Sequence, residues 1–172
     1  MKKIVLKYGT IASIIVVGIP AVSMVFTGSG RDSFDMGEVI GYSSMIVAMG
    51  LVYFAMRYFR DKENEGELTF GQGMKIGVLI SAMGGAAWGL YNFIFVTFIM
   101  PDFNEQYYAH QTGQEIGSPE FEQGFAQMME ANGFMFSKAG GTLLMFVTVF
   151  LIGFIISVIS SLILQRKSVA AA

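Results

Sequence analysis

Four long apolar blocks constrain the fold of this chain more than any other feature of its sequence. They cover residues 5–26, 37–58, 74–100 and 139–164, and charged side chains occur only near their ends. A helix of about 20 apolar residues crosses the hydrocarbon core of a bilayer. Only 14% of the residues are charged, whereas soluble domains carry about 25%, so a soluble bundle of four such helices would lack a polar surface. The blocks therefore predict an all-α membrane protein in which four transmembrane helices form an antiparallel bundle.

This bundle accounts for nearly the whole chain. Residues 1–167 are expected to form a single transmembrane domain, and residues 168–172 a flexible tail. The first block leaves one alternative open, because lysines precede it and Ala21-Val22-Ser23 resembles the cleavage site of a secretory leader. The apolar run continues to Phe26, which makes it long enough to span, so we expect it to be retained as a helix. Cleavage would leave three helices in the same orientation.

Basic residues are distributed unevenly between the two ends of the predicted helices. With the N-terminus in the cytoplasm, only Arg31 and Lys138 fall outside. Nine fall on the inner side: Lys2, Lys3, Lys7, Arg57, Arg60, Lys62, Lys75, Arg166 and Lys167. An excess of Lys and Arg marks the cytoplasmic side of short loops. We therefore expect a multi-pass protein of a bacterial cytoplasmic (inner) membrane, with the N-terminus and the C-terminus cytoplasmic and the lipid bilayer as its main partner.

Capping patterns mark the starts of two of these helices. An Asp or Thr followed three residues later by Glu or Gln is typical of a capping box, and the sequence has Asp35 with Glu38 and Thr69 with Gln72. Gly66 precedes the second pattern in a short loop and can adopt the left-handed conformation that ends a helix. We therefore expect tight connections between the first three helices, with helix starts at these two caps.

The connection before the last helix, residues 101–138, is too long for a simple turn. Within it, Ser118 can cap a helix, Pro119 suits the first helical position, and Gly133 can end the helix. The apolar residues of this segment fall on one stripe of a helix: Phe121, Phe125, Met128 and Met129. The sequence thus predicts a short amphipathic helix over residues 119–132. It lies either in the membrane interface or, as we favour, over the outer ends of the bundle as a lid.

A row of small residues follows the third apolar block at steps of four: Gly73, Gly77, Ser81, Gly85 and Gly89. Small residues at this spacing let membrane helices approach one another closely. We expect this face to pack against another helix of the same bundle. An interface with a second copy of the chain or with a membrane-protein partner is the alternative.

Three residues near the end of the same block are candidates for a polar contact or a cavity: Trp88, Tyr91 and Asn92. The Asn92 amide is the most polar side chain well inside a span, and an amide without a hydrogen-bond partner is costly in an apolar environment. We expect it to bond to a neighbouring helix. The alternative is that it contacts a substrate in a central cavity.

Several kinds of chemistry lack their residues in this sequence. There is no cysteine, which excludes disulfides and thiol catalysis. The single histidine, His110, lies among scattered carboxylates without the fixed spacing of a metal site, so we read it as part of a solvated loop and expect no metal. No acid lies at mid-membrane, and no pattern suggests a cofactor, a catalytic site or nucleic-acid binding. The sequence therefore favours a protein that is not an enzyme.

The connection between the second and third helices carries a recognisable motif. It reads Tyr58-Phe59-Arg60-Asp61-Lys62, then Gly66, then a stretch in which Phe70-Gly71 begins the next helix. This motif, with Arg60, Asp61, Lys62, Gly66, Phe70 and Gly71 as its main residues, resembles that of the domain of unknown function 4199 family of small bacterial membrane proteins. The resemblance covers nearly the whole chain and implies four helices with a longer loop before the last. It implies no catalytic or binding residue.

These observations leave two functions to weigh. A non-enzymatic membrane protein that acts by association, as an accessory or scaffold subunit, fits the small-residue row and the large outer loop. The alternative is a small oligomeric transporter or channel. A water-accessible cavity around Asn92, Tyr91 and Ser81 would favour that alternative.

Overall fold

Helices make up nearly all of the chain in the computed structural model, which describes residues 1–27 and 34–166. The helices are α1 Lys2–Thr27, α2 Phe34–Tyr58, α3 Phe70–Ile94, α4 Phe103–Thr112, α5 Pro119–Phe136 and α6 Lys138–Leu164. Two long helices continue into a π-helical turn, η2 Phe59–Glu63 after α2 and η3 Phe95–Ile99 after α3. Predictions that concern Arg31, Lys167 and the 168–172 tail lie outside the described residues.

Four of these helices are long and apolar enough to cross a membrane, which confirms the prediction of four long apolar helices. They cover Lys2–Phe26, Phe34–Glu63, Phe70–Ile99 and Lys138–Leu164. The third helix begins before its apolar block because Thr69 caps it, and this capping box is confirmed. The Thr69 hydroxyl accepts a hydrogen bond from the Gln72 amide at 3.2 Å, and the Gln72 side chain accepts one from the Thr69 amide at 2.9 Å.

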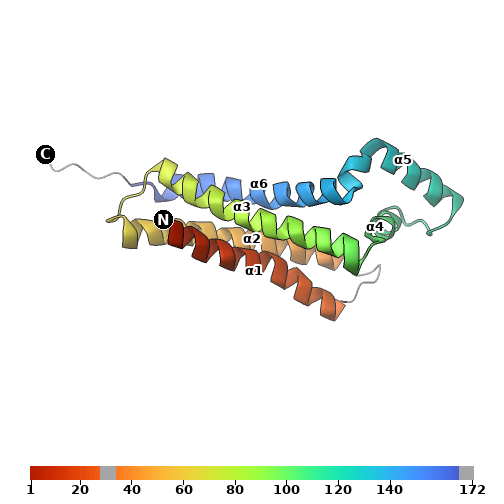
Figure 1. Ribbon diagram of the computed structural model, residues 1–172, viewed down its shortest axis with the longest axis horizontal. Coiled ribbons are helices and arrows are strands. Elements are labelled where there is room, and N and C mark those ends of the chain that lie inside the picture. The colour runs from red at the N-terminus through yellow and green to blue at the C-terminus, as the bar shows by residue number, and fades with distance from the viewer. Residues whose placement is uncertain (28–33, 167–172) are drawn as a thin grey trace.

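The four long helices lie side by side, and α4 and α5 lie beyond one end of them (Figure 1). The N-terminus and the end of α6 lie at the opposite end. The most extensive contact is between α3 and α6, while α1 packs on α2 and α3, and α2 also packs on α6. We call the end with the α2–α3 connection the hairpin end, and the end covered by α4 the pocket end.

Methionines of α2 fill the centre of the bundle. Met49 is fully buried, and its terminal methyl lies against Gly84 of α3 while its sulfur lies against Gly153 of α6. Met56 is also fully buried, and its sulfur accepts a long hydrogen bond from the Ser161 hydroxyl at 3.7 Å. Because methionine is flexible and unbranched, it adapts to the irregular gaps that glycines leave. Two glycine-bearing helices and one methionine-bearing helix thus form one close-packed core.

The predicted capping role of Asp35 is wrong. Helix α2 already begins at Phe34, so Asp35 lies within its first turn and not before it. One Asp35 carboxylate oxygen instead lies 2.9 Å from His110 Nε2 on α4. The interaction between two helices far apart in the sequence replaces the local cap. His110, read from the sequence as part of a solvated loop, is therefore a helix-to-helix contact.

The long connection before α6 contains two helices. The Ser118 hydroxyl accepts a hydrogen bond from the Phe121 amide at 3.2 Å, and Pro119 opens α5. The backbone leaves helical geometry at Asn132, where the sequence predicts the helix to end, but helical structure resumes as far as Phe136. In Figure 1, α5 extends beyond the bundle. The shorter helix α4, which was not predicted from the sequence, is the one that lies across the bundle end.

Candidate functional site

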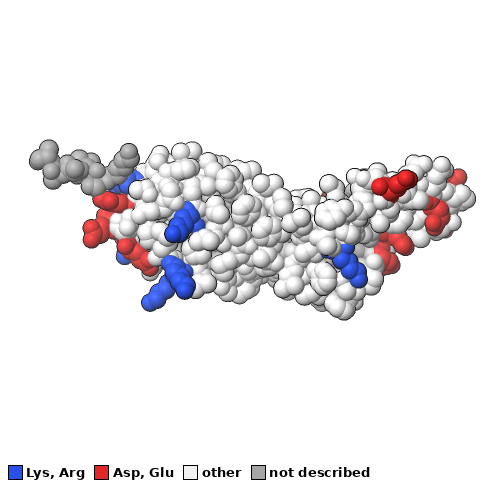
Figure 2. All heavy atoms as spheres, turned by 45° about the horizontal axis from the view of Figure 1, so that its top comes forward, with Lys and Arg blue, Asp and Glu red and all other residues white. Residues whose placement is uncertain are grey.

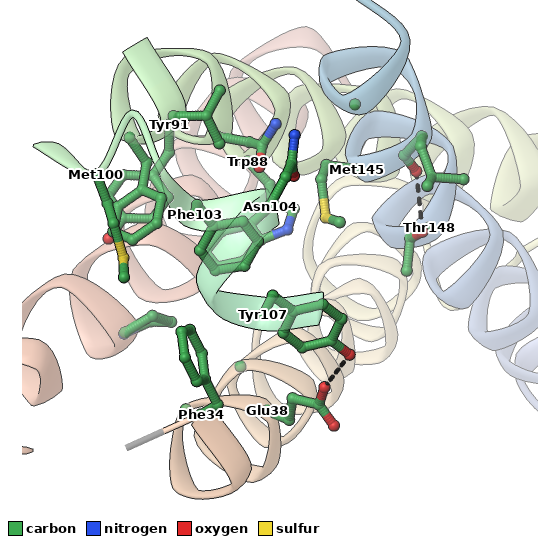
Figure 3. Close-up of a pocket in the computed structure, with 18 of the residues that line it drawn as sticks. Phe34, Glu38, Trp88, Tyr91, Met100, Phe103, Asn104, Tyr107, Met145 and Thr148 are labelled. Atoms are coloured by element: carbon green, nitrogen blue, oxygen red, sulfur yellow. Dashed lines mark hydrogen bonds between the residues drawn. The ribbon is translucent and has the colours of Figure 1, made fainter. Parts of the chain in front are cut away.

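A pocket of about 430 Å³ lies at the pocket end of the bundle. Its walls come from the end of α1, the first turns of α2, the last turns of α3 with η3, and the start of α6. Helix α4 covers it with Phe103, Asn104 and Tyr107 (Figure 3). Most of the lining is aromatic, aliphatic or methionine, with a few polar groups among these residues, which is the usual composition of a small-molecule site.

The three residues singled out near the end of the third block all line this pocket. The Trp88 and Tyr91 rings are stacked, with centroids 5.2 Å apart and planes 28° apart. The indole nitrogen of Trp88 is buried and has no hydrogen-bond partner among the described residues. The Asn92 amide nitrogen lies near Gly141 of α6, which also lines the pocket. Ser81, in contrast, is buried away from the pocket and donates a hydrogen bond to the Gly77 carbonyl at 2.7 Å.

Aromatic rings form a continuous wall from α3 to α4. Tyr91 contacts Phe95 at 6.0 Å between centroids, Phe95 contacts Phe103 at 5.6 Å, and Phe103 stacks on Tyr107 at 5.6 Å with planes 13° apart. Phe34 of α2 contacts both Phe103 and Tyr107 edge-on at 5.8 Å. Contacts of this kind add to the stability gained from burial. The wall therefore holds α4 against α2 and α3 and shapes the pocket at the same time.

The π-helical turn η3 sets the shape of the wall. The Met100 amide donates to the Phe95 carbonyl at 2.8 Å, a hydrogen bond over five residues instead of four. This widens the last turn, and Phe95 and Val96 from it line the pocket. The Thr97 hydroxyl of the same turn is buried without a partner among the described residues.

Two polar contacts tie α4 to α2 at the rim. The Tyr107 hydroxyl donates to the Glu38 carboxylate at 2.5 Å, and His110 Nε2 lies 2.9 Å from the Asp35 carboxylate (Figure 3 shows the first). Burial and the hydrogen bond to Glu38 raise the pKa of Tyr107 to about 12. The Tyr107 phenol therefore stays protonated, and stays a donor to Glu38, well above neutral pH.

Five residues that build this site are not predicted as site residues from the sequence: Phe34, Glu38, Phe103, Asn104 and Tyr107. One indication was available, since Phe103, Tyr107 and His110 follow the spacing of one helix face. That stripe predicts a helix in the first part of the long connection. Its partner surface on α2 is not visible in the sequence, because the rest of α2 and the whole of α3 separate Phe34 and Glu38 from α4 along the chain.

The row of small residues lies along α3 where it meets α6. A Cβ on Gly73 would lie 2.5 Å from the Ser161 hydroxyl oxygen, and Gly77 lies against Ser157. A Cβ on Gly85 would lie 2.8 Å from the Phe146 carbonyl oxygen, and one on Gly89 would lie 2.9 Å from that of Thr142. Ser81 continues the row opposite Gly153. The two backbones approach so closely at Gly85 and Gly89 that no side chain fits between them.

The connection motif lies at the hairpin end, far from the pocket in Figure 1. Arg60 contacts Asp61 at 2.6 Å, and the Gly66 amide donates to the Arg60 carbonyl at 2.8 Å. Gly66 has φ of +84°, the left-handed conformation expected of it. Lys62 lies in η2, Phe70 begins α3, and nothing lies within 4 Å of a Cβ built on Gly71. The motif therefore shapes the turn between two helices.

The connection is also fastened to the end of α6. Leu68 and Arg166 exchange two backbone hydrogen bonds of 3.0 and 2.8 Å. The Arg60 guanidinium reaches the Leu164 carbonyl at 3.5 Å. The hairpin end thus closes around the last turn of α6. Over residues 1–27 and 34–166, no three histidine or carboxylate side chains come together as candidate metal ligands.

Four apolar helices of spanning length around a pocket at one bundle end define a helical membrane protein. The family model described as "Protein of unknown function (DUF4199)" matches residues 7–166, nearly the whole chain. The protein belongs to this family, as its connection motif led us to expect. Searches of curated proteins and of solved structures gave no match.

Proposed function

We propose that this protein is a non-enzymatic membrane protein that binds a small apolar or amphipathic molecule in the pocket under α4. The observation that carries the proposal is the pocket itself, about 430 Å³ in volume and walled by aromatic rings. The unpartnered indole N–H of Trp88 on its wall supports it, because a buried donor without a partner is costly unless a ligand or water satisfies it.

The lining residues favour binding over catalysis. Glu38 already accepts the Tyr107 hydrogen bond, and the Ser137 hydroxyl caps α6 by accepting from the Gly140 amide at 3.0 Å. The partner of Glu38 is a phenol, and the Ser137 hydroxyl bonds to backbone groups, so neither is paired as a nucleophile is with its base. Among the described lining residues there is no histidine or lysine to serve as such a base.

The proposal includes a four-helix antiparallel bundle in a bacterial cytoplasmic membrane, with both termini in the cytoplasm. Eight Lys and Arg residues of the described chain belong to the hairpin end: Lys2, Lys3, Lys7, Arg57, Arg60, Lys62, Lys75 and Arg166. Figure 2 shows basic side chains gathered near that end. An excess of basic residues favours the cytoplasmic side, so the pocket would open near the outer surface.

Single cysteines test this orientation, because the chain has none of its own. In intact cells, a membrane-impermeant thiol reagent should label Thr112→Cys, at the end of α4, and leave Asn64→Cys, in the α2–α3 connection, unlabelled. After permeabilisation both should react. The reverse pattern would place the pocket on the cytoplasmic side.

Ligand binding can be followed through Trp88, the only tryptophan. Triphenylphosphine oxide, a neutral aromatic molecule, should quench the fluorescence of the purified full chain saturably. Gly41 is buried, lines the pocket and has nothing within 4 Å of a Cβ built on it, so Gly41→Leu would fill the pocket and should weaken binding at least about tenfold. Gly50→Leu, on the same helix but outside the pocket, is the control. Equal quenching in both variants, or no saturation, would refute the proposal.

A second function, association as an accessory or scaffold subunit, is favoured by α5. This helix extends beyond the bundle, packs mainly on α4 and the start of α6, and carries Phe134 at 69% exposure. Replacing Phe134 with Ser should release a membrane-protein partner or a second copy from the complex purified in mild detergent. Co-purification that is unchanged by this variant would count against association through α5.

A further inference from the structure

We infer that the ligand is an amphipathic cation, bound with its ammonium or phosphonium group between Glu38 and the aromatic wall and its apolar part deeper in the pocket. This inference rests on the proposed function and narrows it to one class of molecule. Three separate features of the pocket support it: the charge of the lining, the ring faces, and the charge of the surrounding surface.

The lining carries one charged group. Among the described residues around the pocket, Glu38 is the only acid and there is no lysine or arginine. A phosphate or carboxylate headgroup would therefore find no cation to pair with, and Glu38 would repel it. A cation would find a carboxylate close to an apolar site, where the attraction between charges is stronger than in bulk water.

Tyr107 holds that carboxylate in position. Its hydroxyl donates to Glu38 at 2.5 Å. The pKa of Tyr107 is raised to about 12, so the phenol remains a neutral donor under physiological conditions. The site thus presents one carboxylate at the rim, fixed in position by its neighbour on α4.

The aromatic wall is a second feature that attracts a cation. Phe34, Trp88, Tyr91, Phe95, Phe103 and Tyr107 all line the pocket. The face of an aromatic ring attracts a cation, and rings grouped around a site are the usual means of recognising quaternary ammonium groups. Tyr107 belongs to this wall and also contacts Glu38 (Figure 3). The carboxylate and the ring faces therefore meet at one place.

The surface around the pocket end is acidic. Asp35, Asp102 and Glu105 lie on or beside α4 and the start of α2, and the basic side chains described in this region are Lys138 and His110, which contacts Asp35. Figure 2 shows acidic side chains over this end of the molecule, beyond the bundle. A surface of one sign raises the local concentration of ions of the opposite sign, so cations are drawn toward the mouth of the pocket.

The rest of the lining suits the apolar part of such a molecule. Met45 of α2, Leu144 and Met145 of α6 and Met24 of α1 contribute apolar side chains to it. Three of these four are methionines, which adapt to ligands of different shape. The Trp88 indole N–H and the Asn92 amide add hydrogen-bond donors at the wall without adding charge.

A matched pair of probes separates charge from shape. Methyltriphenylphosphonium and triphenylphosphine oxide share three phenyl rings on phosphorus, but the first is a cation and the second is neutral. Quenching of Trp88 gives the affinity of the purified full chain for each probe in an uncharged detergent. The wild type should bind the phosphonium roughly tenfold more tightly than the oxide, as expected for a carboxylate and a ring wall acting together.

Glu38→Gln should remove most of that preference, with an unchanged affinity for the oxide showing that the pocket is intact. Glu67→Gln removes one negative charge at the hairpin end and should change neither affinity. Phe103→Leu keeps an apolar side chain but removes a ring face, and should weaken phosphonium binding about threefold while the oxide binds as before.

The outcomes distinguish the two proposals. If the wild type binds both probes equally, or if Glu38→Gln leaves the preference intact, the cation inference is wrong while the pocket still binds small molecules. If neither probe quenches Trp88 saturably, the proposed function itself fails. Should Glu38→Gln fail to fold, the preference of the wild type and the Phe103→Leu variant decide the question.

Discussion

The two ends of this bundle are built from the same helices but packed differently. At the hairpin end, α3 presents Gly73 and Gly77 to α6, and the connection is bonded to the end of α6. At the pocket end, Gly85 and Gly89 still bring α3 against α6, but Trp88 and Tyr91 of α3 line a cavity. The size of the residues on each part of a helix surface thus decides where the helix closes on its neighbour and where it leaves room.

This contrast also separates stability from binding. Close backbone contact contributes dispersion energy without needing polar groups, which is the main source of helix association in lipid. A pocket forfeits part of that contact, and the aromatic wall and α4 restore some of it. We therefore expect substitutions in the small-residue row to affect the whole bundle, and substitutions in the wall to affect α4 and the ligand.

The largest expected effect is at Gly85. A Cβ there would already lie 2.8 Å from the backbone carbonyl oxygen of Phe146, and backbone cannot move aside as a flexible side chain can. Gly85→Leu should therefore lower the free energy of unfolding in detergent by about 3 kcal/mol or more. The loss can be measured as a fall in the thermal midpoint of unfolding. Gly50→Leu is the control and should change this midpoint little, because nothing lies within 4 Å of a Cβ built on Gly50. Equal falls in both variants would contradict the distinction between packed and open glycines.

A smaller and more local effect is expected at Phe103. Its ring contacts Phe34, Phe95 and Tyr107 but is only half-buried, so Phe103→Ala should cost about 1–2 kcal/mol, less than a fully buried ring. Hydrogen exchange should speed up across α4, while the amides of α3 near Gly77 stay protected. Faster exchange along the whole of α3 would show that the two ends of the bundle are not independent.

The Thr69 cap is expected to have an effect of about 1 kcal/mol, typical of a lost helix cap. Thr69→Ala removes the acceptor of the Gln72 amide, and the thermal midpoint should fall while probe binding at the other end stays the same. Thr148→Ala is the comparison for the thermal midpoint alone, because its hydroxyl donates to the Leu144 carbonyl of its own helix while Thr148 also lines the pocket. A change in probe binding on losing the Thr69 cap would link the hairpin end to the pocket.

The smallest effect concerns Tyr107 and appears only in alkali. Its pKa is raised to about 12 in the folded protein, against about 10 for a free tyrosine. A raised pKa stabilises the fold fully below pH 10, and this contribution is lost as the pH rises toward 12. In a tyrosinate absorbance titration, the curve of the wild type minus that of Tyr107→Phe should show one group that titrates near 12. A difference curve centred near 10 would mean that the Glu38 contact does not persist.

The sequence predicts much of the fold because its strongest features are local. Apolar runs of spanning length, the Thr69–Gln72 box and Gly66 act through residues a few positions apart, and each lies where the sequence predicts it. The small residues of α3 could be predicted as one face, though not that α6 would meet them. Features that depend on residues close together in the sequence could therefore be predicted.

The pocket could be predicted only in part for the same reason. Trp88, Tyr91 and Asn92 stand out because polar and aromatic groups are unusual within a span. The residues opposite them do not stand out in the sequence, because Glu38 and Phe34 come close to Tyr107 only after α4 has folded back over α2. Asp35 shows most clearly what local patterns cannot predict. Its neighbours in the sequence predict a helix cap, but its carboxylate contacts His110, which is far away in the sequence.

The pairing of Leu68 with Arg166 has a consequence for biosynthesis. Helix α3 leaves the ribosome long before α6, so its glycine face and the Leu68 backbone have no partner while the remainder of the chain is still being translated. The three-helix intermediate must wait in the membrane with this glycine face exposed to lipid or to an insertion chaperone. A chain that stops before α6 would keep the glycine face permanently exposed, and we expect membrane quality-control proteases to recognise and degrade it.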